Sequence, residues 1–529
     1  MEVPDWQTIP RMLRDLAEEH PSDTVVVDGP VRLTLAELRT RAGGIARGLI
    51  ALGVRAGDRV AIWGPNDLHW VVCAFGVWDA GAVLVPLSSR FKGVEAAGVL
   101  RSTGTNVLIT GHGHDGTVLA DLLAETAGGP ARGLPFAGLP DLRHSIVPEE
   151  LERPGSLRPS QLLSAGSRIG HAEAEDRARA VRPDDLCEIM STSGTTGTPK
   201  GVMLEHAPTL RGYRDWAEIV TLGPGDRYPV IAPFSHGFGL NAGLLASVMR
   251  RATMMPIRVF GPELLAALIR DRRITILAGP PTLFHRLLEE TDVGDHALRV
   301  AICGAASVPP ELVRRLTEQI GLERVINAYG LMEGTVVAMT RADDPVEVVA
   351  SSAGRPVPGM EVRIVGDDGL DVPAGERGEV LVRGYGVMRG YWGEPDKTAE
   401  VIRDGWLHTG DVGTLDPRGN LSIVDRKKEL FISGGFNVSP AEVEGLLLRE
   451  GSLAQAAVIG VPDARLGEVG WAFVVPRPGA AVDPEKIIAW ARDNMSNYKA
   501  PRRVIVVEAL PANANGKIDK RALRARVAH

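Results

Sequence analysis

The sequence predicts an α/β protein with a large N-terminal domain of doubly wound sheets and a small α+β domain after it. Its 529 residues are too many for one hydrophobic core, so two or more domains are expected. Residues 57–63, 66–80 and 82–87 follow the order strand, helix, strand, and the two strands are largely apolar. Apolar strands joined by a helix indicate a parallel sheet that is covered on both faces.

Turn and cap signals predict the elements around this unit. Residues 24–33 have the pattern of two short strands about a turn. Thr34 is placed to cap a helix that runs to Leu52, with Glu37 at the spacing of a capping box. Residues 104–182 continue the pattern weakly, and the Gly, Ala and Arg content around 126–139 and 165–182 indicates surface loops.

Later segments repeat the alternation. Residues 274–281 and 300–307 each have the pattern of a strand that ends in a turn, and residues 377–384 form a strand bounded by charges. The last hundred residues predict an α+β unit, with strands at 456–461, 470–475 and 504–507 and a helix at 484–493.

Composition and charge exclude several classes of protein. Hydrophobic residues make up 44% of the chain and the formal net charge is −7, with acids and bases interspersed. This balance argues against a nucleic-acid or anionic membrane surface as the main partner. No window approaches about 20 uninterrupted apolar residues, so no membrane insertion is expected.

The three cysteines, Cys73, Cys187 and Cys303, are far apart and lie in apolar or glycine-rich surroundings. A disulfide framework or a metal site needs cysteines at paired spacing, so these are predicted to be reduced core thiols. Residues 1–10 lack the apolar core of a signal peptide. A cytoplasmic protein is expected.

The most informative stretch is residues 191–201, where six hydroxyl side chains and two glycines precede a Pro-Lys-Gly end. Backbone N–H groups of such a loop form an anion nest, hydroxyls add donors, and a lysine adds a charge suited to phosphate. The pattern is neither a Walker loop nor a dinucleotide fingerprint, because its spacing differs and the apolar residues after it predict a strand. The predicted phosphate-binding residues are Thr192, Ser193, Gly194, Thr195, Thr196, Gly197, Thr198 and Lys200.

Further motifs follow this loop. A strand is predicted to end at Pro233 and a helix to start near Asn241. His236 lies between them in a turn that the flanking glycines make flexible. Residues 300–307 end in small residues whose flat backbone suits a planar ring, and residues 327–333 read Asn-Ala-Tyr-Gly-Leu-Met-Glu. Taken singly, each of these segments is also compatible with an ordinary turn.

Together these segments resemble the adenylate-forming superfamily, which includes acyl-CoA synthetases, amino-acid adenylation domains and luciferases. The resemblance covers roughly the whole chain, with the motifs in the family's order and at its spacing. It implies ATP and Mg²⁺ and a small C-terminal domain that is mobile. It also implies two half-reactions: an acid attacks the α-phosphorus of ATP and releases pyrophosphate, and the acyl-adenylate then passes to a thiol.

The resemblance also assigns residues. Lys517 is implied as the catalytic lysine, Glu333 as a Mg²⁺ ligand together with Thr196, and His236 as a wall or gate of the acyl pocket. Lys428 falls at the hinge. The implied nucleotide and CoA contacts are Gly304, Ala305, Ala306, Ala328, Tyr329, Gly330, Met332, Asp411 for the ribose, Arg426 for ribose or phosphate, and Gly434 and Gly435 beside the pantetheine tunnel.

Two features of the sequence leave alternatives for the substrate and the acceptor. Met332 stands where the family usually has a threonine, so a hydroxyl donor near the substrate oxyanion is missing. The turn at Ser235 and His236 holds no acid, which argues against an α-amino acid substrate. The sequence favours transfer of a small or medium organic acid to CoA. A carrier-protein thiol, an amine, nitrite activation of the diazotase type and a non-catalytic nucleotide-binding relative are the alternatives.

The predicted organisation is an adenylation domain over 1–424, a hinge over 425–429 and a mobile domain over 430–529. The expected partners are an acid, ATP, and CoA or another thiol or amine acceptor. A homodimer is included among the expected assemblies, and the acid itself is not identified by the sequence.

Overall fold

The computed structural model describes residues 4–113, 115–127, 136–192, 200–271, 273–279, 283–284, 287–288, 295–304, 308, 310–366, 368–426, 431–511, 518 and 520–527. The chain divides into two compact units. The first comprises Met1–Ser89, Leu100–Met190 and Gly201–Asp425, and the second comprises Arg90–Val99, Ser191–Lys200 and Arg426–His529.

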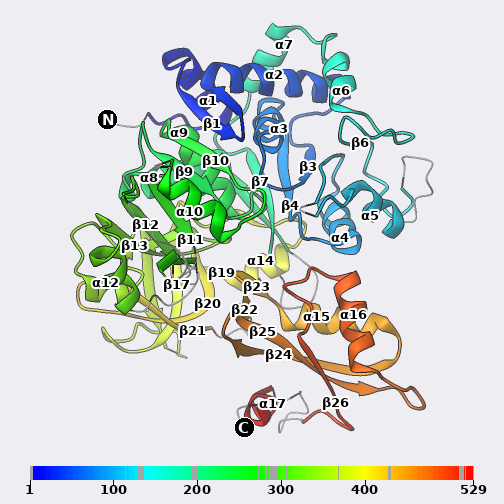
Figure 1. Cartoon of the computed structure of the whole chain (residues 1–529), viewed down its shortest axis with the longest axis vertical. Helices are drawn as coiled ribbons and strands as arrows, with labels where there is room; N and C mark the ends of the chain where they lie inside the picture. Colours follow the sequence, from blue (N-terminus) through cyan, green and yellow to red (C-terminus); the bar gives the residue numbers. More distant parts are fainter. Residues whose placement is uncertain are drawn as a thin grey trace. The chain divides into compact units, whose positions relative to one another are not determined.

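The main sheet of the first unit is built around the predicted strand–helix–strand segment. β3, β4, β5 and β6 run parallel, and β7 is parallel to β4. The helices α2 and α3 pack against each other beside it (Figure 1). In sheet order the strands are β18 (Gly390–Tyr391), β8 (Lys200–Glu205), β7 (Leu186–Thr192), β4 (Val83–Leu87), β3 (Arg59–Trp63), β5 (Val107–Thr110) and β6 (His144–Ile146).

Three further sheets complete the first unit. One has the order β2 (Val31–Thr34), β1 (Thr24–Asp28), β10 (Thr253–Pro256) and β9 (Arg227–Val230). A second has the order β11 (Ile276–Gly279), β12 (Val300–Gly304), β13 (Arg324–Leu331), β14 (Thr335–Met339) and β15 (Arg355–Pro356). The third has the order β16 (Met360–Val365), β17 (Gly378–Gly384), β20 (Trp406–Leu415) and β19 (Ile402–Arg403), with β21 (Leu421–Arg426) beside β20.

The helices follow the predicted cap signals where these are strong. The side chain of Thr34 accepts a hydrogen bond from the Glu37 N–H and the Glu37 carboxylate accepts one from the Thr34 N–H, so the predicted capping box is confirmed. The helices with their bounds are α1 (Ile9–Glu19), α2 (Leu35–Ala51), α3 (Leu68–Asp79), α4 (Gly93–Thr103), α5 (Leu119–Thr126), α6 (Pro159–Gly166), α7 (His171–Arg179), α8 (His206–Ile219), α9 (Ala246–Met249), α10 (Pro262–Arg270), α12 (Pro310–Glu318), α13 (Val346–Ser351) and α14 (Pro395–Val401).

The second unit is α+β. Its sheet has the order β23 (Phe436–Val438), β22 (Phe431–Ser433), β25 (Gly467–Pro476) and β24 (Leu453–Asp463), with β26 (Arg503–Val506) parallel to β25. Its helical segments are α15 (Pro440–Leu447), the 3₁₀ turn η2 (Leu448–Glu450), α16 (Pro484–Asn494) and α17 (Lys520–Val527). Apolar residues of α15, α16 and the strands form its core.

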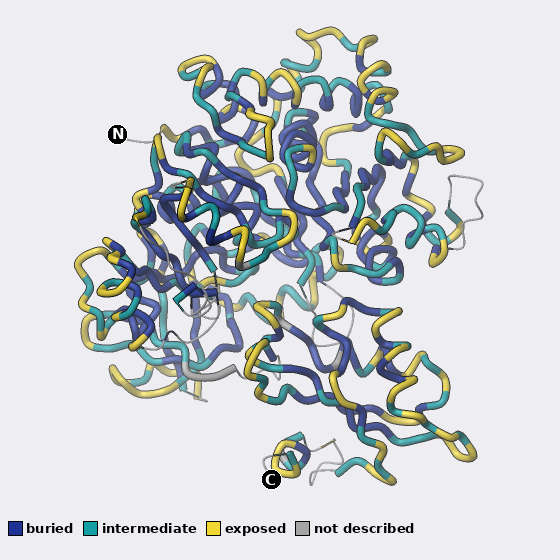
Figure 2. Tube along the Cα trace, in the orientation of Figure 1, coloured by how far each residue is buried: buried dark blue, intermediate teal, exposed yellow. Residues whose placement is uncertain are grey.

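Both units place their strands in buried cores, as Figure 2 shows. Cys73, Cys187 and Cys303 are free and buried in the first unit, which confirms the prediction of core thiols. The predicted fold class, a mixed α/β chain with a larger N-terminal and a smaller C-terminal domain, is confirmed.

Candidate active site

The β13–β14 hairpin presents the Tyr329–Glu333 segment. Gly330 is needed there because a Cβ on it would lie 2.4 Å from the carbonyl oxygen of Thr335. Thr335 takes a positive φ of 52°, which non-glycine residues rarely adopt. A tight, strained turn of this kind fixes the direction in which Glu333 leaves the strand.

Glu333 is held by a residue far away in the sequence. The hydroxyl of Tyr391, on β18, donates a hydrogen bond to Oε1 of Glu333 over 2.9 Å. Burial, and then the neighbouring Glu333 carboxylate, raise the pKa of Tyr391, so the phenol keeps its proton and remains a donor. No sequence motif links these two residues, so sequence reasoning missed Tyr391 as part of the site.

Asp411 and Tyr329 also meet. The Tyr329 hydroxyl donates to Oδ2 of Asp411 over 2.5 Å, and the Asp411 side chain is buried. Asp411 lies inside β20, which continues to Leu415. The pairing of β20 with β17 shifts register near this point, and Thr409 accepts a hydrogen bond from the Asp411 N–H over 3.1 Å. The irregularity redirects the carboxylate without ending the strand.

His236 lies in the predicted turn, although the flanking elements differ from expectation. β9 ends at Val230, before Pro233, and the next helix, η1 (Phe238–Leu245), is a π-helix that begins three residues before Asn241. Glycine explains the close packing, since a Cβ on Gly239 would lie 2.1 Å from the Pro233 carbonyl oxygen. The N–H of Phe238 donates to Nδ1 of His236 over 3.2 Å, which fixes the exposed ring.

Met332 reaches the same turn. A Cβ on Gly237 would lie 3.2 Å from the Met332 sulfur, so Met332 is brought next to the turn that holds His236, the predicted wall or gate of the acyl pocket. On the neighbouring strand, Gly304 ends β12 in register with Ala328 of β13.

The other predicted site residues are placed individually. Thr192 ends β7 half-buried, and Lys200 begins β8 buried; both are grouped with the second unit. Arg426 ends β21, and Gly434 and Gly435 form the β22–β23 turn with φ values of 57° and 84°. Predictions outside the described residues are those for Ser193, Gly194, Thr195, Thr196, Gly197, Thr198, Ala305, Ala306, Lys428 and Lys517.

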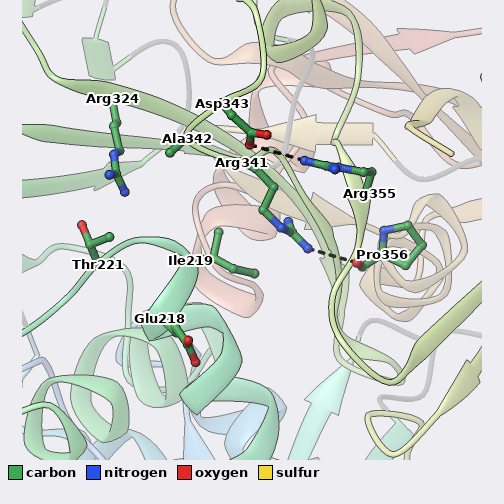
Figure 3. Close-up of a pocket in the computed structure, with 9 residues that line it drawn as sticks. All are labelled: Glu218, Ile219, Thr221, Arg324, Arg341, Ala342, Asp343, Arg355 and Pro356. Atoms are coloured by element: carbon green, nitrogen blue, oxygen red, sulfur yellow. Dashed lines mark hydrogen bonds and ion pairs between the residues drawn. The ribbon is translucent and has the colours of Figure 1, made fainter. Parts of the chain in front are cut away.

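A cavity of about 590 Å³ lies elsewhere in the first unit (Figure 3). Its wall includes Arg324, at the start of β13, whereas Tyr329 lies near the other end of that strand. Arg341 donates to the Pro356 carbonyl oxygen over 3.0 Å, and Arg355 faces Asp343 over 3.5 Å. None of the predicted site residues lines this cavity, and two of its three arginines are engaged by the protein itself.

Among the described residues, no group of three or more His, Cys, Asp or Glu side chains is arranged to hold a metal ion. None of the described helices combines the length and the apolar character needed to cross a lipid bilayer.

Comparison with known families decides the relationship. Residues 13–392 match the AMP-binding enzyme family, and residues 442–517 match the AMP-binding enzyme C-terminal domain. The chain belongs to the AMP-binding enzyme family. The resemblance that was inferred from the motifs is therefore confirmed.

Relatives of this AMP-binding enzyme are similar over their whole length. One, from Rhodococcus jostii, is a CoA ligase named for a propanoyl group on a 7a-methyl-1,5-dioxo-octahydroindenyl ring; it is 43% identical, over 98% of each chain. A feruloyl-CoA synthase from an Amycolatopsis species is 36% identical, over 96% of this chain and 97% of that relative.

Solved structures share the fold. An o-succinylbenzoate CoA synthetase from Bacillus subtilis, bound with a product analogue, aligns with a TM-score of 0.82 at 26% identity over 97% of each chain. An amide bond synthetase from Marinactinospora thermotolerans aligns with a TM-score of 0.78 at 28% identity, over 97% of this chain and 99% of that one.

Proposed function

We propose that this AMP-binding enzyme activates an organic acid with ATP, releases pyrophosphate, and transfers the acyl group from AMP to CoA. The observation that carries the proposal is the end of β13, where Tyr329 meets Asp411 and Glu333 meets Tyr391. Two oriented carboxylates beside an aromatic ring suit a ribose, a metal–phosphate group and an adenine. The CoA ligases among the relatives support CoA as the acceptor.

The nucleotide roles follow from this geometry and from the family. Asp411 accepts hydrogen bonds from the ribose hydroxyls, and Tyr329, which donates to Asp411, orients it beside the adenine. Gly304, Ala305, Ala306, Ala328 and Gly330 provide the thin wall that a planar ring needs. Arg426 binds ribose or phosphate oxygen.

Glu333 fits a magnesium ion. Mg²⁺ in proteins commonly takes one or two carboxylates and completes its shell with phosphate oxygens and water, so a lone oriented carboxylate suffices. Thr196 is the proposed second ligand. When bound, Mg²⁺ neutralises phosphate charge. The Tyr391 hydrogen bond occupies one lone pair on Oε1 and holds the carboxylate in one orientation.

The remaining roles belong to the phosphate loop and the small domain. Residues Thr192 to Thr198 and Lys200 cradle the phosphates through backbone N–H groups, hydroxyls and one ammonium. Lys517 neutralises charge that develops between the carboxylate and the α-phosphorus. The small domain, over 430–529, then rotates about Lys428 in the hinge at 425–429, and Gly434 and Gly435 border the path of the thiol.

The acid is proposed to carry a ring. The relatives are named for a propanoyl group on a bicyclic ring and for a feruloyl group. An amine acceptor is the second candidate, because an amide bond synthetase shares the fold over nearly the full length. The three free, buried cysteines support a cytoplasmic location.

The test is ATP–pyrophosphate exchange by the full chain with a panel of ring-bearing acids, followed by addition of CoA. Acid-dependent exchange and thioester formation are expected. Lys517→Ala should reduce exchange far more than thioester formation from supplied acyl-adenylate, whereas Lys486→Ala, an exposed lysine of α16, should change neither. If turnover requires an amine, or nitrite together with an arylamine, and does not depend on CoA, the enzyme is not a CoA ligase and the corresponding alternative replaces this assignment. Absence of exchange with every acid would contradict adenylation itself.

A further inference from the structure

Three buried polar side chains lie beside the His236–Gly237 turn and take no part in the proposed nucleotide chemistry. They are Glu188 on β7, Asn241 on η1 and Tyr213 on α8, and are called the polar cluster below. Glu188 and Asn241 are fully buried, and Tyr213 is 5% exposed. Asn241 donates from Nδ2 to Oε1 of Glu188 over 2.7 Å.

The polar cluster is not satisfied by the protein. Oε2 of Glu188 and Oδ1 of Asn241 are buried and have no hydrogen-bond partner among the described residues. A buried polar atom without a partner is destabilising, so native proteins nearly always supply one. One further polar group that reached both atoms would satisfy them together.

The state of Glu188 identifies the group that fits. Burial raises the pKa of Glu188 to about 7, and Asn241 opposes the shift only in part. A protonated Glu188 can donate from Oε2, while Oδ1 of Asn241 can only accept. A hydroxyl both accepts and donates, so it satisfies both atoms; a keto oxygen satisfies only the acid, and a hydrocarbon satisfies neither.

The polar cluster lies next to the turn of His236, which the resemblance implies to be a wall or gate of the acyl pocket. A Cβ on Gly237 would lie 3.6 Å from Oη of Tyr213, 3.9 Å from Nδ2 of Asn241 and 3.2 Å from the sulfur of Met332. Gly237 follows His236 directly. The polar cluster is therefore separated from the His236 turn by little more than the absent side chain of one glycine.

We propose that Glu188 and Asn241, with Tyr213 beside them, form a recognition point for a hydroxyl group on the ring of the acid. The inference rests on the proposed function and on the acyl-pocket role that the resemblance implies for His236. It makes Glu188 a specificity-determining residue that acts in binding and has no part in the transfer of the adenylyl group.

The experiment compares matched acids. Cyclohexylpropanoic and phenylpropanoic acids, each with its ring-hydroxylated derivative, and the ring-keto derivative of the first, are assayed by pyrophosphate release with the full chain. The hydroxy acid is expected to exceed its unsubstituted partner in kcat/KM by about tenfold or more, chiefly through KM, with the keto acid between them. Glu188→Leu should reduce the hydroxy-to-unsubstituted ratio to about one, and Glu188→Gln, which keeps a donor, should retain part of it.

Matched variants separate recognition from folding. Asp226→Asn changes another buried acid, whose partners Thr275 and Arg299 lie outside the polar cluster, and should leave the ratio unchanged. Asn241→Leu should reduce the ratio as Glu188→Leu does, which keeps the test available if one variant fails to fold. Equal losses with all acids, accompanied by a lower Tm, would mean that the polar cluster holds a structural water only and would overturn the proposal. If the wild type releases no pyrophosphate with any acid, the proposed function itself is contradicted.

Discussion

Each unit buries carboxylates, and the two units surround them differently. In the first unit, Glu188 receives one hydrogen bond, from the neutral amide of Asn241. In the second, Nζ of Lys499 lies 2.7 Å from Oε1 of both Glu95 and Glu442. Oε2 of Glu95 also accepts from the N–H and the hydroxyl of Ser496, over 3.0 and 2.9 Å.

The charge of the partner explains the difference. Burial alone lowers the pKa of Lys499, but Glu95, Tyr498 and Glu442 raise it above its ordinary value, so the ammonium persists. A buried cation between two acids compensates part of their desolvation, although Oε2 of Glu442 has no hydrogen-bond partner among the described residues. Among the described residues Glu188 has no cationic partner, and its pKa, raised to about 7, favours the protonated form below neutral pH. The comparison teaches that Lys499 compensates the charge of its acidic partners within the fold, whereas Glu188, with a neutral partner, can hold a proton that it offers to a ligand.

The largest expected effect comes from removing the cation. Lys499→Met keeps the length of the side chain and leaves Glu95 and Glu442 buried without a counter-charge. Breaking a buried ion pair from one side typically costs about 3–5 kcal/mol. The loss should appear as faster hydrogen exchange of the β24 and β25 amides, which report on the second unit.

An exposed lysine provides the control for that loss. Lys486→Met on α16 removes the same charge from a solvent-exposed position and should leave the exchange rates nearly unchanged. If Lys499→Met and Lys486→Met behave alike, the distinction between the two buried regions is wrong.

A somewhat smaller effect is expected from pH in the first unit. The pKa of Glu188 is raised from 4.5 to about 7 in the folded protein, so folding favours the protonated form. Its contribution is complete below about pH 4.5 and is lost as the pH rises through about 7. The shift corresponds to a stability change on the order of 3 kcal/mol. Two further titratable groups interact with Glu188, and both stay neutral: burial, and then Glu188, raise the pKa of the Tyr213 hydroxyl and of the Cys187 thiol.

The measurement compares urea unfolding of the wild type and Glu188→Gln from about pH 5 to about pH 8. The variant cannot ionise at this position, so its stability relative to the wild type should rise across that interval. Parallel stability curves for the two proteins would show that Glu188 is not held in its protonated form.

Features that are encoded within a few neighbouring residues could be predicted from the sequence alone. The capping box at Thr34 and Glu37 and the strand after the phosphate loop depend on local spacing, and the structure has them. Contacts between distant segments were not predictable, since Glu188 and Asn241 are 53 residues apart and Glu333 and Tyr391 are 58 apart.

Local conformation also limited the prediction. The π-helix that carries Asn241 depends on glycines meeting the backbone and side chains of residues 230–233, which no helical pattern reveals. The direction of Asp411 depends on an irregularity in the pairing of β20 with β17, which the sequence pattern does not reveal. In both cases packing against a neighbouring segment decided the geometry.

The smallest expected effect concerns Glu333, which lies between the two cases. It is half-buried and, like Glu188, has a neutral donor, the Tyr391 hydroxyl at 2.9 Å. If it binds Mg²⁺ as proposed, the cation arrives with the nucleotide, and Tyr391 only orients the carboxylate. Tyr391→Phe should therefore weaken Mg²⁺ binding by about 1 kcal/mol. The Mg²⁺ concentration for half-maximal pyrophosphate exchange should rise about fivefold, while the rate at saturating Mg²⁺ stays nearly unchanged.

The control is Tyr228→Phe, which changes another buried tyrosine of the first unit and should leave that Mg²⁺ concentration unchanged. A lower saturating rate with an unchanged Mg²⁺ requirement would place Tyr391 in the reaction itself and would remove Glu333 from the comparison.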